Sequence, residues 1–248
     1  MPKVQRIFGI PGRDADPERP DQAKAVAIIM DGSGRWAAKR GLPVEEGHRE
    51  GTRALRRTVE AAISLGVRAL AVYAFSTENW ARPVSEVEDL MTIFEETIER
   101  ELPDLAEQGV RTRFIGRRDR VHADLRALME RLEDATADRN RLDLWIAFDY
   151  GGRDELVAAA RRLVEEGLAP EDIDESALTA RLYAPSLDPV DLLIRTSGEV
   201  RVSNFVLWEA AYAELVFTDT LWPDFGEADL RAALEEFARR QRRFGGRA

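Results

Sequence analysis

The chain has 248 residues, 44% of them hydrophobic and 33% charged, and a formal net charge of −10. This length suits one large α/β domain, and the acidic balance argues against a general nucleic-acid binder, which needs a basic face. The sequence has no cysteine and two histidines, so disulfides, thiolate zinc sites and cysteine nucleophiles are excluded, and a metal ion would be held by oxygen ligands, which favours Mg²⁺.

The ends of the chain and its hydropathy predict where the protein works. Four prolines lie among charged residues in positions 1–22, which predicts a mobile N-terminal leader before one domain over residues 23–248. No basic stretch precedes an apolar core, so no signal peptide is expected, and no apolar run reaches the roughly 20 residues of a membrane span. We expect a cytoplasmic protein that could still act on a lipid at the inner membrane surface.

The first predicted strand and the loop after it carry the clearest sign of a ligand site. Residues 25–30 are apolar or small, as in a strand buried on both faces, and Asp31 ends the run. Gly32 and Gly34 would let an oxygen-rich ligand approach the backbone where a helix begins, and Asp31 could hold a divalent cation against phosphates. The pattern predicts a diphosphate and magnesium site, although an ordinary strand–turn–helix capped by Ser33 explains it equally well.

Apolar runs and helical periodicity alternate along the rest of the chain. Gly66 is expected to end the first long helix, and a capping box of Ser85 and Glu88 is expected to start the next. Further strands are predicted over residues 69–75, 110–115, 142–148, 191–194 and 214–217. Further helices are predicted over residues 44–65, 85–108, 119–138, 153–166, 174–183, 203–212 and 227–240. This alternation predicts an α/β fold: a single domain with a mostly parallel six-stranded sheet flanked by helices.

Polar side chains follow three of the predicted strands at the point where each strand ends. The carboxyl ends of parallel strands lie at one edge of a sheet, so residues far apart in the sequence would meet there. Guanidinium groups bind phosphate oxygens in pairs, so four arginines near this edge would suit two diphosphate groups. These arginines are Arg35, Arg82, Arg195 and Arg201.

Five segments resemble the signature blocks of the cis-prenyltransferases, whose best-known members are the undecaprenyl diphosphate synthases. In the family's order the segments are MDGSGRWA, GHREG, YAFSTENWARP, IRTSGEVRVSNF and LWEAAYAEL with LWPDF. The resemblance runs from about residue 25 to residue 246 and leaves the leader outside. It implies that residues 23–248 form a cis-prenyltransferase catalytic domain.

The resemblance implies an Mg²⁺-dependent transferase that condenses isopentenyl diphosphate with an allylic diphosphate such as farnesyl diphosphate. Each step would form a cis double bond, and the product would be a (Z)-polyprenyl diphosphate, expected to be the medium-chain lipid carrier of cell-wall synthesis. The C-terminal segment RRFGG resembles a motif that reaches the partner subunit's active site, which implies a homodimer. No nucleic-acid partner is expected, and the lipid product implies peripheral contact with a membrane.

The resemblance also assigns roles to single residues. It implies that Asp31 and Glu214 hold Mg²⁺ on a diphosphate. The residues expected to be catalytic are Asp31, Ser76, Asn79 and Arg82. The residues expected to bind substrate are Gly32, Ser33, Gly34, Arg35, Trp36, Arg40, His48, Thr77, Glu78, Trp80, Arg195, Arg201 and Ser203. Ionising an allylic C–O bond needs a departing diphosphate stabilised by metal and arginine, which this set would provide.

A growing hydrocarbon chain would need an apolar tunnel. Such a tunnel is expected between the sheet and the helix over residues 85–108, although an ordinary core explains most of the residues better one by one. The candidate lining residues are Ala71, Tyr73, Phe75, Leu90, Phe94, Ile98, Trp145 and Ile146.

The chain departs from the family pattern at four positions. Ser33 and Asp149 stand where the family usually has asparagine, and Val200 stands where a polar residue is commoner. Val44 stands where many members have an arginine that contacts the allylic diphosphate. This loss should weaken the allylic site, although Arg40 could compensate.

Three alternative functions stay open. An aspartyl phosphotransferase would use Asp31 as nucleophile but usually carries a second aspartate two residues later, where this chain has Ser33. A non-catalytic partner subunit would lose the metal carboxylates, whereas this chain keeps both Asp31 and Glu214. A short-chain or irregular, branched prenyl diphosphate synthase of specialised metabolism is kept open by the departures at Ser33 and Val44.

Overall fold

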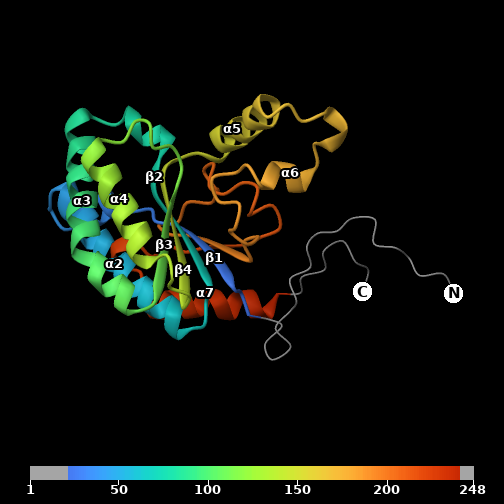
Figure 1. The fold of residues 1–248 in the computed structure, drawn as a ribbon. Helices are drawn as coiled ribbons and strands as arrows, with labels where there is room; N and C mark the ends of the chain where they lie inside the picture. The colour runs from blue at the N-terminus through green and yellow to red at the C-terminus, as the bar shows by residue number, and fades with distance from the viewer. Residues whose placement is uncertain (1–21, 241–248) are drawn as a thin grey trace.

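The computed structural model describes residues 22–240 and has a twisted β-sheet at its centre (Figure 1). Its six strands lie in the order β3-β4-β2-β1-β5-β6, and each neighbouring pair is parallel. The predicted α/β domain with a six-stranded sheet is therefore confirmed. The strands are β1 (Ala25–Ile29), β2 (Ala69–Ser76), β3 (Val110–Ile115), β4 (Leu142–Tyr150), β5 (Leu192–Arg195) and β6 (Glu214–Phe217).

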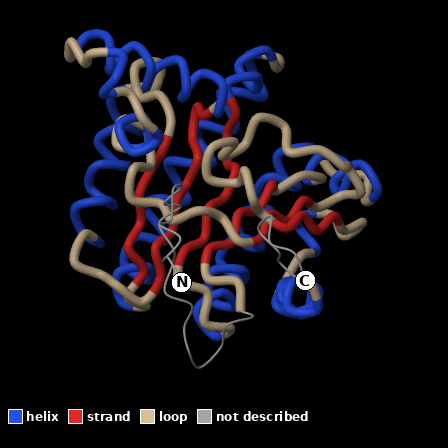
Figure 2. Tube along the Cα trace, turned by 90° about the vertical axis from the view of Figure 1, so that its right-hand side faces the viewer, coloured by secondary structure: helices blue, strands red, loops and turns tan. Residues whose placement is uncertain are grey.

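Helices follow each strand up to β4 and surround the sheet, as Figure 2 shows, whereas turns without a helix connect β5 to β6. The α-helices of the described residues are α1 (Ser33–Lys39), α2 (Val44–Ser64), α3 (Val84–Glu107), α4 (Ala123–Thr136), α5 (Gly152–Glu165), α6 (Glu175–Thr179) and α7 (Glu227–Arg239). Three short 3₁₀ helices complete the set: η1 (Thr77–Ala81), η2 (Pro170–Asp172) and η3 (Trp222–Asp224).

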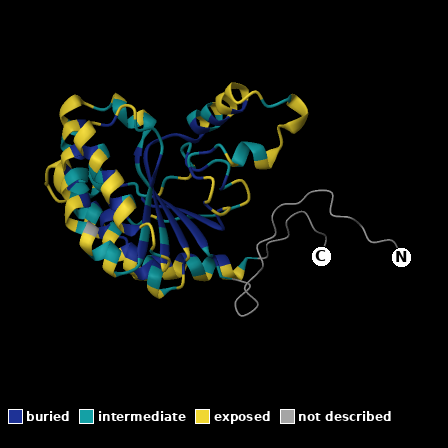
Figure 3. Cartoon of the chain, in the orientation of Figure 1, coloured by how far each residue is buried: buried dark blue, intermediate teal, exposed yellow. Residues whose placement is uncertain are grey.

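The two faces of the sheet carry different side chains, because successive residues of a strand point to opposite sides. In β1, Val26 and Ile28 belong to the larger core, which the sheet shares with α2, α3, α4 and α7. Ala25 and Ala27 belong to a second core on the other face, where residues 184–190 and 202–213 cover the sheet on the side of α5 and α6. Figure 3 shows most of the strands buried between these layers, while the residues of β6 are of intermediate exposure and the outer helix faces stay exposed.

This alternation corrects the predicted tunnel lining. Ala71, Tyr73 and Trp145 pack in or against the second core, on the face away from α3. The sheet separates Ala71 and Trp145 from the other candidates, so these two cannot share a tunnel with them, whereas Tyr73 at the end of β2 lines the same cleft as Leu90. The candidates that do pack in or against the larger core are Phe75, Leu90, Phe94, Ile98 and Ile146.

Helix starts differ from prediction where a local cap had been expected. Gly66 follows the end of α2 with a φ of +76°, as expected of a C-cap glycine. The predicted capping box at Ser85 is wrong, because Pro83 is the N-cap residue of α3 and Ser85 already lies in the first turn. A capping box forms instead between Ser76 and Asn79, at the start of η1.

Two predicted helices are also corrected. Helix α4 begins at Ala123, because residues 119–122 belong to the loop after β3. Residues 203–212 form turns rather than a helix. Ser203, Asn204 and Val206 have φ values of +44°, +64° and +36°, which lie in the left-handed region and cannot continue a right-handed helix.

The predictions about both ends of the chain fall largely outside the described residues. This applies to the leader over residues 1–22, apart from Gln22, and to the RRFGG segment at residues 242–246. Within residues 22–240, no helix combines the length and apolar character that a membrane crossing requires.

Candidate active site

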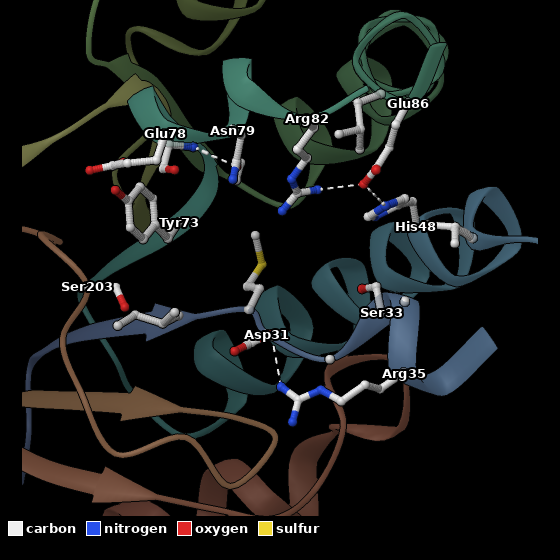
Figure 4. Close-up of a pocket in the computed structure, with 18 of the residues that line it drawn as sticks. Asp31, Ser33, Arg35, His48, Tyr73, Glu78, Asn79, Arg82, Glu86 and Ser203 are labelled. Atoms are coloured by element: carbon white, nitrogen blue, oxygen red, sulfur yellow. Dashed lines mark hydrogen bonds and ion pairs between the residues drawn. The ribbon is translucent and has the colours of Figure 1, made fainter. Parts of the chain in front are cut away.

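A cleft of about 760 Å³ opens at the carboxyl ends of β1, β2 and β5 (Figure 4). Because β1 lies between β2 and β5, the loops after these three strands meet there although they are far apart in the sequence. The predicted residues that line the cleft are Asp31, Gly32, Ser33, Gly34, Arg35, His48, Ser76, Glu78, Asn79, Arg82, Arg195 and Ser203.

One side of the cleft, here named the strand wall, consists of Asp31, Arg35, Arg195 and Ser203. The buried Arg195 guanidinium donates to Asp31 Oδ2 at 2.9 Å and to Ser203 Oγ at 2.5 Å. Arg35 lies on α1, one turn after Asp31, with its guanidinium 3.2 Å from Asp31 Oδ1. The carboxylate is therefore held between two cations, and both cations border the cleft.

The charge state of Asp31 follows from this arrangement. Burial alone would raise the pKa of Asp31, but the hydrogen bond and charge of Arg195, with the charge of Arg35, outweigh it. The pKa of Asp31 is therefore lower than that of a free aspartate, and the group is ionised at neutral pH. Mg²⁺ is commonly bound by one carboxylate together with substrate phosphates, so Asp31 is a suitable ligand for it at this cleft.

The backbone around Asp31 is fixed by a residue that sequence reasoning missed, Thr196. Its hydroxyl accepts a hydrogen bond from Asp31 N at 2.9 Å and donates to Asp31 O at 2.6 Å. Thr196 is fully buried at the end of β5. It lies inside the IRTSG segment next to Arg195, and that position was the available signal.

The two glycines of the loop lie in different surroundings. Gly32 has a φ of +113°, and a Cβ there would lie 3.0 Å from atoms of Leu221 and Ser197, so a side chain at this position would strain the backbone. No atom lies within 4 Å of the position of a Cβ on Gly34, so this glycine leaves the cleft open beside the first turn of α1.

The opposite side of the cleft, here named the helix wall, consists of Asn79, Arg82, Glu86 and His48. Arg82 pairs with Glu86 Oε1 at 3.0 Å, and the same oxygen lies 3.9 Å from His48 Nε2. Figure 4 shows these side chains facing Asp31 and Arg35 across the cleft. Burial, together with the charge of Arg82, lowers the pKa of His48 below its usual value, so this histidine is neutral at neutral pH. Glu86 was not predicted as a site residue.

The η1 segment places Ser76, Glu78 and Asn79 at the edge of the cleft. Asn79 Oδ1 accepts a hydrogen bond from Ser76 N at 2.9 Å, and Glu78 accepts hydrogen bonds from Thr77 Oγ1 and Asn204 Nδ2. Burial would raise the pKa of Glu78. The hydrogen bonds from its own backbone, Ser76, Asn204 and Thr77 outweigh burial and lower the pKa below its usual value. Ser76 and Asn79 are thus fixed relative to each other.

Some predicted substrate-binding residues lie outside the cleft lining. Trp36 Nε1 donates to Asp224 Oδ1 at 2.7 Å, and Arg40 stacks on the Trp36 ring while also pairing with Asp224. These contacts fasten α1 to η3. The Arg201 side chain pairs with Glu199 at 2.6 Å, although its carbonyl accepts a hydrogen bond from Arg195. The remaining two are Thr77, which bonds to Glu78, and Trp80, which bonds to Asp149.

Glu214 does not join Asp31 within one chain. It lies at the start of β6, level with Leu192 on β5 and Val26 on β1, so Asp31 is about 16 Å further along the strands at roughly 3.3 Å per residue. Glu214 pairs with Arg240 at 3.0 Å. The predicted metal pair is therefore corrected for a single subunit, and the described residues contain no cluster of three or more acidic, histidine or cysteine side chains suited to a metal.

A family model described as putative undecaprenyl diphosphate synthase matches residues 29–245. The chain belongs to the undecaprenyl diphosphate synthase family, the cis-prenyltransferases. Membership confirms the resemblance found in the sequence and makes the protein an isoprenyl transferase, which removes the aspartyl phosphotransferase alternative. The matched region includes the glycine loop over residues 31–35 and every residue of the strand wall.

Curated relatives match over most of their length. The chain is 52% identical to isoprenyl transferase 2 of Bradyrhizobium diazoefficiens over 93% of both chains. It is 51% identical to the isoprenyl transferase of Bacillus subtilis, over 89% of this chain and 86% of the relative. It is 49% identical to a ditrans,polycis-undecaprenyl-diphosphate synthase of Xanthomonas axonopodis pv. citri, over 89% of this chain and 87% of the relative. That relative is named as specific for (2E,6E)-farnesyl diphosphate.

Two solved structures share the fold. Lavandulyl diphosphate synthase from Lavandula x intermedia, in complex with dimethylallyl diphosphate, superposes with a TM-score of 0.87 at 37% identity over 91% of this chain and 99% of the other. A probable undecaprenyl diphosphate synthase from Campylobacter jejuni superposes with a TM-score of 0.77 at 30% identity, over 90% of this chain and 99% of the other.

Proposed function

We propose that this isoprenyl transferase condenses isopentenyl diphosphate with an allylic diphosphate such as farnesyl diphosphate and releases a (Z)-polyprenyl diphosphate. One observation carries the proposal: the cationic strand wall faces Arg82 of the helix wall across a cleft whose lining also includes apolar Met30, Ala74 and Leu90. Such a cleft offers positive charge to two diphosphates and apolar contact to a prenyl chain. The name of the Xanthomonas relative supports farnesyl diphosphate as the allylic substrate.

The residues of the cleft would have separate roles in binding and orienting the two substrates. Arg35 and the open loop at Gly34 would bind the allylic diphosphate, while Arg195 and Ser203 would orient isopentenyl diphosphate. Asp31 would hold Mg²⁺, which when bound supplies a Lewis acid that stabilises the departing diphosphate. Ser76, Asn79 and Arg82 would orient the isopentenyl group for attack and for loss of its proton; their mutual contacts support a positioning role.

The growing prenyl chain would run along the α2–α3 face of the sheet. A narrow apolar cavity of about 50 Å³ lies further along this face, between α2, α3 and β4, and is lined by Leu55, Val59, Ile98 and Ile146 among others. Ion pairs join α2 to α3 beside it, from Arg56 to Glu101 and Asp104. A cavity of this size is far below the volume of a long prenyl chain, so elongation would require side chains here to move or α2 to part from α3.

The proposal includes a homodimer, which the resemblance of the RRFGG segment implies.

The site of action is a further part of the proposal. A product destined for cell-wall synthesis must pass to a membrane, and exposed apolar residues lie at the starts of α2 and α3: Val44 and Val84, with Leu42 just before α2. Val44 also lines the cleft. These residues would give the protein a peripheral contact with the inner membrane surface from a cytoplasmic position.

One assay tests the proposal. The protein is incubated with Mg²⁺, isopentenyl diphosphate and allylic diphosphates of increasing length, and the products are identified by mass and double-bond geometry. Long products with new cis double bonds are expected. Failure to elongate any allylic diphosphate, by protein shown to be folded, would overturn the proposal and favour a non-catalytic subunit.

A second candidate function is a short or irregular prenyl condensation. It is favoured by the superposition on lavandulyl diphosphate synthase and by Val44, an uncharged residue in the cleft lining. The same assay with dimethylallyl diphosphate alone decides it, because a branched ten-carbon product can form only if one allylic molecule attacks another.

A further inference from the structure

Asp149 is a fully buried carboxylate behind the helix wall, at the end of β4. Its Oδ1 accepts a hydrogen bond from Trp80 Nε1 at 2.8 Å, and its Oδ2 accepts one from Arg120 Nε at 2.9 Å. A second hydrogen bond from the Arg120 guanidinium reaches Oδ1. A carboxylate in the interior is costly unless its charge is paired and its oxygens are satisfied, and Trp80 and Arg120 meet both conditions.

The same groups surround the Trp80 ring. The Arg120 guanidinium carbon lies 5.3 Å from the ring centroid, within cation–π range. Phe75 meets the ring edge-on, with centroids 5.2 Å apart. The indole is therefore restrained at its nitrogen, over its face and at its edge, by residues of β2, β4 and the loop after β3.

Trp80 belongs to η1, which also accepts a hydrogen bond from Asn204 at Glu78. No residue of η1 is buried, and Trp80 is its one side chain among the hydrophobic groups that pack against the larger core. Asn79 precedes Trp80, and Arg82 follows η1 directly; both line the cleft. A displacement of the indole would therefore move Asn79 and Arg82.

We propose that Asp149 and Arg120 act as positioning residues that clamp Trp80 and so hold η1 in place at the cleft. This step rests on the proposed function, because it assigns η1 the task of orienting isopentenyl diphosphate. It also revises the role of Trp80, whose indole anchors the segment from behind rather than lining the cleft. Neither Asp149 nor Arg120 reaches the cleft, so both act through Trp80.

The kinetic test uses Asp149→Leu and Arg120→Met. Each is expected to lower kcat about tenfold and to raise KM for isopentenyl diphosphate about fivefold, since small misplacements of positioning groups are costly. KM for the allylic diphosphate should change by less than about twofold, because Asp31 and Arg35 lie on other elements. Asp149→Asn keeps an acceptor for the indole and should show a smaller loss, so it preserves the test if Asp149→Leu does not fold.

Arg111→Met is the matched control. Arg111 pairs with Asp143 at the start of β4, so its loss removes an arginine–aspartate pair from the same strand at the end away from the cleft. This variant should leave all three kinetic parameters unchanged. Equal effects of Arg111→Met and Arg120→Met would overturn the proposal, since the loss would then reflect general damage to the sheet.

A spectroscopic measurement decides the clamp without turnover. The chain has five tryptophans, so the emission of Trp80 is taken as the difference between each protein and its Trp80→Phe counterpart. The Trp80 emission should shift to longer wavelength in Asp149→Leu and Arg120→Met but not in Arg111→Met. If wild-type protein transfers no prenyl group, the proposed function fails while this measurement still tests the clamp; an unshifted emission overturns the clamp whatever the activity.

Discussion

The strand wall and the helix wall of the cleft are held by different parts of the fold. On the strand wall, Arg195 is 5% exposed, and its neighbour Thr196, which bonds to Asp31, is fully buried. Both stand at the end of β5, which lies between β1 and β6. On the helix wall, η1 has no buried residue, and its position depends on side-chain contacts such as Arg82 with Glu86. We therefore expect the strand wall to be preorganised for charge stabilisation, and the η1 part of the helix wall to be more easily displaced by single side-chain changes.

The largest expected effect comes from breaking the strand wall at its carboxylate. Asp31→Asn should lower the rate of isopentenyl diphosphate incorporation by about 10²–10³-fold, the usual cost of losing one preorganised electrostatic group. Asp143→Asn is the control, because Asp143 also lies between two arginines, Arg111 and Arg113, at the opposite end of the sheet. A small loss in Asp31→Asn, similar to that of the control, would refute the role of Asp31.

An intermediate effect is expected from the helix wall. Glu86→Gln removes the negative charge of the carboxylate that both Arg82 and His48 contact. Arg82 should then be less well oriented, and kcat/KM should fall about tenfold. Glu96→Gln is the control, because Glu96 is on the same helix and also pairs with a residue of α2, Arg49. Steady-state kinetics of both variants check this, and equal values would show that the Glu86 pair has no role at the cleft.

A smaller effect on activity is expected from the support of the strand wall. Thr196→Val removes the hydroxyl that binds Asp31 N and O. Asp31 N keeps Ile29 O as a partner and Asp31 O keeps Trp222 N, so the loss should cost only about 1 kcal/mol of unfolding free energy. Activity should fall only a few-fold, because Arg35 and Arg195 still hold the carboxylate. Denaturant unfolding and kinetics measure both quantities. Thr58→Val, a buried threonine on α2, should leave activity unchanged; no activity difference between the two variants would contradict the assignment.

The smallest effect concerns the pH dependence of stability. Because the pKa of His48 is lowered in the folded protein, the unfolded chain binds a proton before the folded one does as pH falls below about 6.5. Stability should therefore decrease as pH falls from about 7 towards the folded pKa of His48. His48→Gln should show a flatter dependence of unfolding free energy over this range. Parallel curves for the two proteins would mean that His48 titrates alike in both states.

The order of strands and helices was predictable because each leaves a local pattern. Buried strands of a parallel sheet are continuous apolar runs. A glycine such as Gly66 ends a helix through its own positive φ, whatever the helix packs against. The helix predicted over residues 203–212 failed because Ser203, Asn204 and Val206 have positive φ values, and serine and valine rarely adopt them, so the residue types gave little sign of the interruption. The box expected at Ser85 failed because Pro83 had already started the helix.

The sequence alone determined which loops would meet and what charges they would bring. A parallel sheet places the ends of β1, β2 and β5 at one edge, so Asp31, Arg82 and Arg195 were expected to line one cleft, and they do. Only the tertiary structure decided which side of each loop faces that cleft. Trp80 lies in the same motif as Asn79, yet its indole bonds to Asp149, and Glu214 lies at the wrong end of its strand to reach Asp31. Proximity in a motif fixes the distance along the chain, whereas the direction of a side chain depends on partners that folding brings from elsewhere.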